Sequence, residues 1–431
     1  MDRLTAQKSD PLEGSVRVPS DKSMSHRALM FGAVSEGVTR ISGPLEAGDV
    51  LSTAAALRAF GVSVERDGPL WIVRGRPWAS PRRALDLGNA GTGVRLLMGL
   101  TAGQGVEATF VGDPSLMRRP MARVLDPLRA MGCEAGDTDG RLPVTVRPSR
   151  PSGFRYSLPM PSAQVKSCVL LAGLGATGPV TVVEPVPTRD HTERMLQAFG
   201  ADLRVDGQAI TLHPGQRLIA PTGLTIPADP SSAAFPMVAA LVVPGSEVQL
   251  TDVMLNPRRI ELIRALRRMG ALIEEGPTKG PSGGEDIADL KVTATQLQAI
   301  HVQPEEVPDM VDEIPILAVA AAFAEGTTRI DGLEELKVKE SDRLAATAGI
   351  LRSAGVPCRA GDDWIEIDGQ ERVAGGGTVD TDHDHRIGMA TLVLGLAAEA
   401  PMAITGASAI ASSFPTFQPM MASLGAKISA A

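Results

Sequence analysis

The sequence predicts a mixed α/β protein of six similar units in two domains, and two interleaved series of glycines carry this prediction. In the first series, an amphipathic helical segment ends at a glycine and a strand-like segment follows, as in AALRAFGVSVE. Glycine readily adopts the left-handed conformation just past a helix, so each glycine marks an expected C-terminal cap. The six glycines are Gly61, Gly132, Gly200, Gly270, Gly355 and Gly425, spaced by 71, 68, 70, 85 and 70 residues.

The second series is in register with the first. More apolar helical segments end near a glycine and precede a strand, with caps expected at Gly37, Gly105, Gly178, Gly245 and Gly326 and with Ala400 as the exception. A period of about 70 residues is too long for a solenoid, so each copy is interpreted as two helices and several strands. Six units divide into two domains of three, with the join near residues 221–230. Residues 274–291, rich in Gly and Pro, predict a surface loop that lengthens the fourth step.

Polar residues gather where the predicted helices begin. The apolar helices open with SDKSMSHR, GNAGTGVR, PSAQVK, DPSSAA, VDEIP and DHDHR, and four amphipathic helices with MRRP, TRDHTE, NPRR and KESDR. The residues concentrated there are Lys22, Ser23, Arg27, Asn89, Thr92, Arg95, Arg119, Ser162, Gln164, Lys166, Arg189, Lys339, Arg343 and Arg386. The positive end of the helix dipole disfavours cations and attracts anions. We therefore expect these starts to form a positive inter-domain cleft that binds phosphates and carboxylates.

Composition limits the class of protein. The chain has 431 residues, 43% of them hydrophobic, which suggests two or three domains. A net charge of −8 argues against a general binder of nucleic acids or membrane surfaces. Three scattered cysteines fit a reducing compartment, and no apolar leader or membrane-spanning run is present. The sequence therefore predicts a cytoplasmic protein.

Several motifs have competing interpretations. GNAGTGVR is similar to a dinucleotide-binding loop, but its glycine spacing differs from that fingerprint. Residues 381–385, TDHDH, could bind a metal, although no further ligand cluster has matching spacing. Ser162 is interpreted as a helix cap in preference to a nucleophile, since no Ser-His-acid set accompanies it. Asp312 and Glu313 are equally compatible with simple partners of a helix dipole.

Nine motifs follow one another in order along the chain. They are DKSMSHR, GNAGTGVR, MRRPMARVLDPL, PSAQVKS, TRDHTE, VDEIPILAVAAAFAEGTT, LKVKESDR, DHRIGM and ASSFP. Through them the sequence resembles the 5-enolpyruvylshikimate-3-phosphate synthase family over essentially its whole length. The forms SAQVKS, TRDHTE and SSFP are similar to the branch called class II, which includes glyphosate-tolerant members.

The resemblance implies an α/β (α+β) fold, namely a two-domain inside-out barrel of six βαβαββ repeats, three per domain, with helix N-termini facing the inter-domain cleft. Residues 21–227 would form a domain that mainly binds shikimate 3-phosphate. Residues 1–20 and 228–431 would form the other, contributing phosphoenolpyruvate-binding and catalytic residues. The implied protein is a monomer that uses no cofactor or metal.

The implied reaction transfers enolpyruvyl from phosphoenolpyruvate to the 5-hydroxyl of shikimate 3-phosphate and releases phosphate. By resemblance, Asp312 is the base toward the hydroxyl, Glu340 the proton shuttle at C3, and Lys22 bridges both substrates and assists proton transfer. The implied phosphoenolpyruvate-binding residues are Lys22, Gly91, Arg119, Gln164, Lys339, Arg343 and Arg386. The implied shikimate 3-phosphate-binding residues are Lys22, Ser23, Arg27, Ser162, Ala163, Gln164, Arg189, Asp312 and Lys339.

The chain departs from the family pattern at several positions. Ser412 stands where many members have a lysine, and Ala163 replaces the second serine of an S-S-Q motif. Glu335 replaces an asparagine-like position. Arg189 stands where other branches have smaller Ser/Tyr contacts, and the resemblance implies that it compensates on the acceptor phosphate. Gly91 occupies the position where resistant members carry alanine, so a glyphosate-sensitive site is expected.

Two histidines near the predicted site are not assigned a catalytic role. His385 is expected to position Glu340 or the phosphate rather than to bind a metal. His26 is expected to be structural, because neither its pattern nor the resemblance gives it a role.

Two alternatives remain open at this point. The related transferase acting on UDP-N-acetylglucosamine typically has Lys-Asn where this chain has Lys22-Ser23, and a reactive cysteine in a loop that here, around Arg119, has none. A non-catalytic phosphate- or nucleic-acid-binding protein would not need Asp312 and Glu340 beside the cations. One tyrosine and three tryptophans also leave little aromatic surface for nucleic acid strands.

Overall fold

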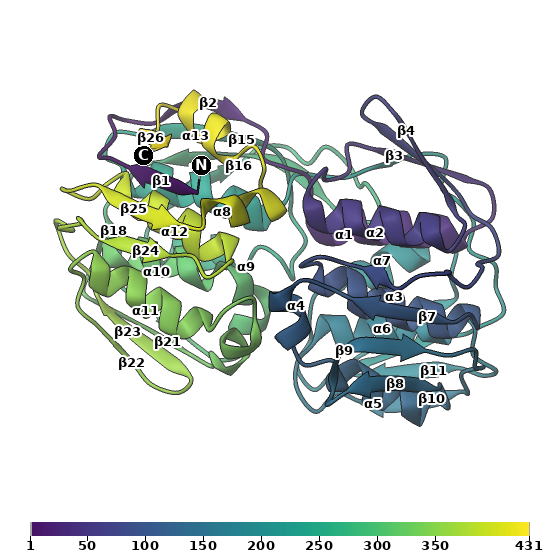
Figure 1. The fold of residues 1–431 in the computed structure, drawn as a ribbon. Coiled ribbons are helices and arrows are strands. Elements are labelled where there is room, and N and C mark those ends of the chain that lie inside the picture. The colour runs from purple at the N-terminus through teal and green to yellow at the C-terminus, as the bar shows by residue number, and fades with distance from the viewer. Residues whose placement is uncertain (1, 431) are drawn as a thin grey trace. The chain divides into compact units, whose positions relative to one another are not determined.

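The structure is a computed structural model that describes residues 2–430, and these form two compact units (Figure 1). The N-terminal unit comprises Lys22–Ile226 and Ser282–Gly284. The C-terminal unit comprises the residues up to Asp21, Pro227–Pro281 and the chain from Glu285 onwards. The fold class is mixed α/β, as predicted.

The N-terminal unit contains three buried helices and three open sheets. Its helices are α1 (Lys22–Val34), α2 (Gly48–Ala59), α3 (Gly91–Gln104), α4 (Pro114–Arg118), α5 (Ala122–Ala130), α6 (Ala163–Gly173) and α7 (His191–Ala198). Its strands are β3 (Val38–Ser42), β4 (Ser63–Asp67), β5 (Leu70–Arg74), β6 (Leu85–Asp86), β7 (Ala108–Val111), β8 (Ala135–Thr138), β9 (Arg141–Val146), β10 (Phe154–Ser157), β11 (Val180–Val183), β12 (Leu203–Asp206), β13 (Ala209–Leu212) and β14 (Leu224–Thr225). The buried helices are α1, α3 and α6.

The three sheets of this unit share one pairing pattern. Their strand orders are β14-β3-β5-β4, β6-β7-β9-β8 and β10-β11-β13-β12, each with one parallel pair followed by two antiparallel pairs. Strand β9 buries Leu142, Val144 and Val146, the alternate residues that an extended chain presents to one face. Helices α3 and α6 pack closely at Gly99, which has no side chain. A methyl group at that position would lie only 2.2 Å from the carbonyl oxygen of Cys168.

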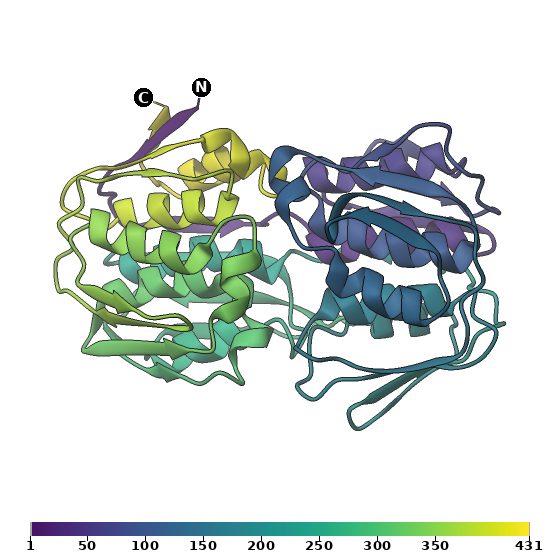
Figure 2. The same ribbon diagram turned by 60° about the horizontal axis from the view of Figure 1, so that its bottom comes forward.

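The C-terminal unit repeats this organisation. Its helices are α8 (Pro230–Val242), α9 (Glu261–Arg268), α10 (Ile314–Ala322), α11 (Arg343–Ser353), α12 (His385–Gly395) and α13 (Phe417–Ser423), with 3-10 helices at Val307–Asp309, Val311–Glu313, Glu334–Val338 and Ala407–Ser412. Its strands are β1 (Arg3–Ala6), β2 (Glu13–Val16), β15 (Glu247–Met254), β16 (Leu272–Glu275), β17 (Ile287–Thr293), β18 (Leu297–Gln298), β19 (His301–Val302), β20 (Ala324–Glu325), β21 (Thr327–Asp331), β22 (Cys358–Ala360), β23 (Trp364–Asp368), β24 (Thr378–Asp380), β25 (Met402–Thr405) and β26 (Ile428–Ala430). Helices α8, α10 and α12 are buried against one another (Figure 2).

Three four-stranded sheets of the C-terminal unit have the same pattern of one parallel and two antiparallel pairs. They are β24-β25-β1-β26, β2-β15-β17-β16 and β19-β21-β23-β22, with β18 and β20 forming a separate parallel pair. Every sheet formed by residues 2–430 is open, so no closed barrel is present there. The arrangement as an inside-out barrel therefore stays a prediction. Within the same residues, no helix is both long and apolar enough to cross a bilayer.

The caps predicted at the six glycines of the first series and at Gly105 are confirmed, whereas Gly37, Gly245 and Gly326 lie three or four residues after the ends of α1, α8 and α10 and are not their caps. All six glycines of the first series have positive φ, between 76° and 96°, as do Gly37, Gly105, Gly245 and Gly326 of the second. The prediction for Gly178 was wrong: α6 already ends at Gly173, and the φ of Gly178 is not positive. Gly178 precedes Pro179, and the residue before a proline is driven toward extended backbone.

The predicted bounds of the surface loop, residues 274–291, extend too far at both ends. Strand β16 extends to Glu275 and β17 begins at Ile287, so the irregular segment is shorter than the Gly- and Pro-rich stretch. Within it, the hydroxyl of Ser282 bonds the backbone of Thr225, which explains why Ser282–Gly284 belongs to the N-terminal unit.

A buried arginine fixes the points where the chain enters and leaves the C-terminal unit. Arg259, just before α9, donates to Asp21 Oδ2 at 2.8 Å and to Asp229 Oδ1 at 2.9 Å. Asn256, three residues earlier, donates to both oxygens of Glu285. Asp21, Asp229 and Glu285 lie at or near ends of the three chain stretches that build this unit. One short segment therefore gathers all three.

Replacing Arg259 by methionine should lower the free energy of unfolding by about 3–5 kcal/mol, because the buried carboxylates of Asp21 and Asp229 lose their counter-charge. Urea unfolding followed by far-UV circular dichroism measures the loss. The matched control is Arg264→Met in α9, whose exposed guanidinium lies 2.9 Å from Glu261 and should contribute less than about 1 kcal/mol. Equal losses in the two variants would contradict the role of Arg259.

Candidate functional site

The first cluster of candidate residues lies at helix starts of the N-terminal unit. Helix α1 begins at Lys22, as predicted, and the Lys22 ammonium lies 3.4 Å from Asp49 Oδ2 in the first turn of α2. Asp49 thus offsets a cation that the dipole of α1 disfavours. The buried Arg27 donates to the hydroxyl of Thr192 at 2.8 Å and to that of Ser167 at 2.9 Å, which joins α1 to α6 and α7.

Helices α3 and α6 bring three further predicted residues together. Arg95 donates to Gln164 Oε1 at 2.7 Å, and the Gln164 amide donates to Thr92 Oγ1 at 3.0 Å. Arg119 bonds the side-chain oxygen of Asn89, and its Nη1 would lie 2.8 Å from a methyl group placed on Gly91. The start of α3 is therefore lined by two guanidinium groups, and a side chain at Gly91 requires these flexible groups to shift.

Helix α6 starts as the sequence predicts. Ser162 is its N-cap, accepting a hydrogen bond from the Val165 N–H, so the interpretation of Ser162 as a cap is confirmed. Ala163 is the first helical residue. Two of the residues that open α6 thus lie where backbone N–H groups favour an anion.

Helix α6 also contains a buried cation, Lys166, about one turn after its start. The Lys166 ammonium is fully buried and contacts Glu184 Oε2 at 2.8 Å and Glu193 Oε1 at 2.6 Å. Arg189 lies between these two glutamates in the sequence, in the segment that joins β11 to α7. Burial raises the pKa of the Glu193 carboxyl, the nearby Glu184 acts in the same direction, and Lys166 opposes the rise.

In the C-terminal unit, Arg343 gathers three carboxylates. It is the first residue of α11 and is 1% exposed. Its Nη1 donates to Asp312 Oδ1 at 3.0 Å, its Nη2 to Glu340 Oε2 at 2.5 Å, and its Nε to Asp384 Oδ2 at 2.8 Å. Burial lowers the pKa of this guanidinium, but the charges of the three carboxylates outweigh it and hold the pKa above its usual value.

Two more cations flank Asp312. The Lys339 ammonium lies 3.6 Å from Asp312 Oδ1, and Arg386 donates to the Asp312 carbonyl at 2.9 Å. Asp312 lies in the 3-10 helix Val311–Glu313, one turn before α10, rather than in the opening of α10 itself. Asp384 caps α12 by accepting from the Arg386 N–H at 3.0 Å. Two candidate acid–base groups, Asp312 and Glu340, thus bond the same guanidinium.

The predicted site residues fall into two sets, one in each unit. The N-terminal set contains Lys22, Ser23, Arg27, Gly91, Arg119, Ser162, Ala163, Gln164 and Arg189, and the C-terminal set contains Asp312, Lys339, Glu340, Arg343 and Arg386. Ser412, at the position where many members of the resembled family have a lysine, has its hydroxyl 3.5 Å from His385 Nδ1. His26 is buried and bonds Thr53 Oγ1 at 2.8 Å, which agrees with a structural role.

Sequence reasoning missed the partners of these cations. Asp49, Glu184, Thr192 and Glu193 were not singled out, although each contacts a candidate cation. One signal was present, because a lysine within an apolar helix, as in SAQVKSCVLL, requires a buried counter-charge. Within residues 2–430, no group of three or more His, Cys, Asp or Glu side chains is placed to hold a metal ion.

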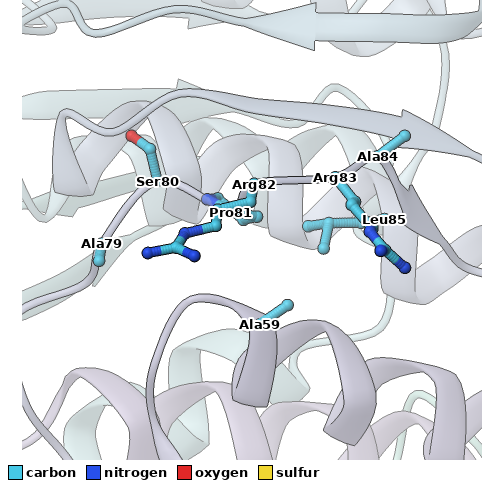
Figure 3. A pocket seen from close by; sticks show the side chains of 8 residues that line it. All are labelled: Ala59, Ala79, Ser80, Pro81, Arg82, Arg83, Ala84 and Leu85. Atoms are coloured by element: carbon cyan, nitrogen blue, oxygen red, sulfur yellow. The ribbon is translucent and has the colours of Figure 1, made fainter.

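A separate surface hollow contains none of the candidate residues. It has a volume of about 450 Å³ and is lined by Ala59 and by residues 79–85, with the side chains of Arg82 and Arg83 at its wall (Figure 3). Both arginines are exposed. This hollow therefore contributes nothing to either set.

Comparisons of this chain with known proteins all indicate one enzyme family. The family model described as EPSP synthase (3-phosphoshikimate 1-carboxyvinyltransferase) matches residues 6–421. Two relatives of that enzyme name, from Pseudomonas sp. strain PG2982 and Rhodopseudomonas palustris strain TIE-1, are 50% and 52% identical, covering 98% of this chain and 97% and 98% of theirs.

Solved structures give the same result. An EPSP synthase from Acinetobacter baumannii superposes with a TM-score of 0.88 at 41% identity, covering 100% of this chain and 99% of the other. The enolpyruvyl transferase NikO from Streptomyces tendae has a TM-score of 0.79 at 20% identity over 99% and 98% of the two chains, and shares the fold.

Replacing Glu193 by glutamine should flatten the pH dependence of stability. A carboxyl whose pKa is raised by folding binds more protons in the folded state, so its contribution to stability falls as pH rises above the unfolded value of 4.5 and through the folded pKa. The variant lacks this titration, so it should lose less stability than the wild type above that pH. Urea unfolding at several pH values measures the difference, with Glu36→Gln, an exposed carboxylate, as the control that follows the wild type. Parallel curves for Glu193→Gln and wild type would refute the buried titration.

Proposed function

The chain belongs to the EPSP synthase family, and we propose that the two sets of side chains described above carry out its reaction. That reaction transfers the enolpyruvyl group of phosphoenolpyruvate to the 5-hydroxyl of shikimate 3-phosphate and releases phosphate, in the shikimate pathway to aromatic amino acids. One observation carries the assignment: the guanidinium of Arg343 donates hydrogen bonds to both Asp312 and Glu340, and the ammonium of Lys339 lies next to Asp312. A pair of carboxylates fixed beside cations suits proton transfer on anionic substrates.

The charges of the substrates explain the cations. Each substrate carries one phosphate and one carboxylate, groups that guanidinium and ammonium bind through charge-assisted hydrogen bonds. We assign phosphoenolpyruvate to Lys22, Gly91, Arg119, Gln164, Lys339, Arg343 and Arg386. We assign shikimate 3-phosphate to Lys22, Ser23, Arg27, Ser162, Ala163, Gln164, Arg189, Asp312 and Lys339.

The proton transfers follow from the positions of the bonds that change. Asp312 takes the proton of the 5-hydroxyl as that oxygen attacks C2, and Glu340 delivers a proton to C3. In the second step a proton leaves C3 and the phosphate departs, which restores the double bond. Lys22 spans both substrates and assists these transfers. Both carboxylates contact Arg343, and Asp312 also contacts Lys339, so both lie beside cations that would hold the anionic substrates; the division of roles between them follows the resemblance.

The finer architecture belongs to the same proposal. Six βαβαββ repeats, three per domain, would account for the six sheets with one common pairing pattern. The functional domains are proposed as residues 21–227 and residues 1–20 with 228–431. A monomeric enzyme in the cytoplasm completes the proposal, and light scattering of the purified chain tests the monomer. The UDP-N-acetylglucosamine alternative gains no support, because the relatives at about half identity are named for the 3-phosphoshikimate reaction.

Asp312→Asn, Glu340→Gln and Lys22→Met should each lower kcat by about 10²- to 10⁴-fold, because each removes a group that moves or stabilises a proton. A coupled assay of phosphate release from shikimate 3-phosphate and phosphoenolpyruvate measures this. In deuterated water, Glu340→Gln should also lose deuterium incorporation at C3. Asp362→Asn, an exposed carboxylate of the same unit, is the control and should be unchanged. Undiminished exchange at C3 in Glu340→Gln would rule out the proposed shuttle.

Glyphosate should inhibit the wild-type enzyme, and Gly91→Ala should weaken that inhibition. An alanine methyl would lie 2.8 Å from Arg119 Nη1 and 3.3 Å from Arg95 Nη1, so both guanidinium groups must shift. The longer inhibitor tolerates the lost space less than phosphoenolpyruvate does. Steady-state inhibition against phosphoenolpyruvate should show the inhibition constant rising more than the KM for phosphoenolpyruvate. High tolerance in the wild type would contradict the role of Gly91.

A further inference from the structure

Lys166 is a buried cation of the N-terminal unit to which the reaction assigns no part. It lies in α6, four residues after the cap Ser162, and its side chain has no exposed surface. Its ammonium contacts Glu184 Oε2 at 2.8 Å, Glu193 Oε1 at 2.6 Å and the carbonyl of Thr188 at 3.5 Å. The hydroxyl of Thr188 in turn bonds the other oxygen of Glu184.

These contacts enclose one segment of chain from both ends. Glu184 directly follows β11, Glu193 lies in the first turn of α7, and Thr188 precedes Arg189. The segment that joins β11 to α7, residues 184–190, has no regular structure of its own. Because the ammonium contacts both ends and the middle of this segment, it limits the positions that Arg189 can take.

The neighbouring residues extend the same junction to α1. Ser167, next to Lys166, bonds the hydroxyl of Thr192, next to Glu193, at 2.7 Å. Arg27 of α1 donates to both hydroxyls. The junction therefore connects the helices that carry Arg27 and Gln164 with the segment that carries Arg189.

Stability alone is a poor explanation for this cation. Burying an ammonium with two carboxylates costs several kcal/mol of solvation, and replacing buried ion pairs by apolar side chains is often neutral or stabilising. Glu193 Oε2 is buried without a hydrogen-bond partner, which adds to that cost. What the cluster provides is a fixed geometry for the segment that it encloses.

We propose that Lys166 is a positioning residue for shikimate 3-phosphate, which acts by fixing Arg189 through its contacts with Glu184, Thr188 and Glu193. This inference rests on the proposed function, in which Arg189 binds the acceptor substrate. Lys166 itself is buried and touches neither substrate. Its removal therefore displaces Arg189 and weakens the binding of one substrate but not of the other.

The test is a double-mutant cycle between Lys166→Met and Arg189→Ala in the full-length enzyme. Lys166→Met should raise the KM for shikimate 3-phosphate about 10- to 100-fold, because small displacements of a binding group have effects of this size, and should leave the KM for phosphoenolpyruvate within about twofold. In the Arg189→Ala background, Lys166→Met should change the KM for shikimate 3-phosphate by less than about twofold, since residues that act through one another are not additive.

Two further variants separate positioning from folding. Val169→Ala, in the same helix and fully buried, creates a cavity but removes none of the charged or hydrogen-bonding groups of the cluster, and should lower the melting temperature while leaving both KM values unchanged. If Lys166→Met fails to fold, the triple variant Lys166→Met/Glu184→Gln/Glu193→Gln removes the repulsion between the carboxylates. It should fold and still show the selective rise in the KM for shikimate 3-phosphate.

The possible outcomes distinguish a failure of the positioning role of Lys166 from a failure of the assignment of Arg189. Equal rises in the KM for both substrates, an unchanged KM for shikimate 3-phosphate in a folded Lys166 variant, or additive effects in the cycle would overturn the positioning role. If Arg189→Ala leaves the KM for shikimate 3-phosphate unchanged, the assignment of Arg189 fails and the inference fails with it. If Arg189→Ala is impaired and Lys166→Met is not, only the inference fails.

Discussion

The pairing of buried cations with carboxylates from distant parts of the chain is the constraint on which both units depend. Lys166, Arg259 and Arg343 are each at most 2% exposed, and each contacts at least two carboxylates. An uncompensated charge at such a depth costs several kcal/mol, comparable to the whole stability of a domain. The segments that supply the carboxylates must therefore arrive at fixed positions. Loops that the hydrophobic core alone would leave adjustable become parts of a defined geometry.

Local signals in the sequence predicted the framework well. Glycine caps and helix starts depend on residues a few positions apart, so a single sequence contains them, and the error at Gly178 arose where the following Pro179 imposes a different backbone. The counter-charges were beyond such reasoning. Glu184 lies 18 residues from Lys166, and Asp21 lies 238 residues from Arg259, distances over which only the folded chain decides which groups meet.

The candidate site divides in the same way. Motifs identified the residues that would contact substrates, because those lie at helix starts with recognisable patterns. The helical opening predicted for Asp312 was displaced by one 3-10 turn, since Pro315 in the first turn of α10 has no N–H to bond the carbonyl of residue 311. Asp384 and Glu193 stand within the motifs DHRIGM and TRDHTE, but a motif does not show which cation its carboxylate contacts in the folded chain. Their function is defined by the cation that they contact.

The two sets of predicted site residues differ in their balance of charge. The N-terminal set defined above has four cationic members, Lys22, Arg27, Arg119 and Arg189, and no acidic member. Such an excess is tolerable only where anions complete it, which is a condition for binding substrates that bring phosphate and carboxylate groups. The C-terminal set contains the cations Lys339, Arg343 and Arg386 together with two carboxylates, Asp312 and Glu340, which contact them. In the proposed reaction, both acid–base carboxylates come from the C-terminal set, whereas cations of both sets bind the substrates, so the proposal requires residues of both units.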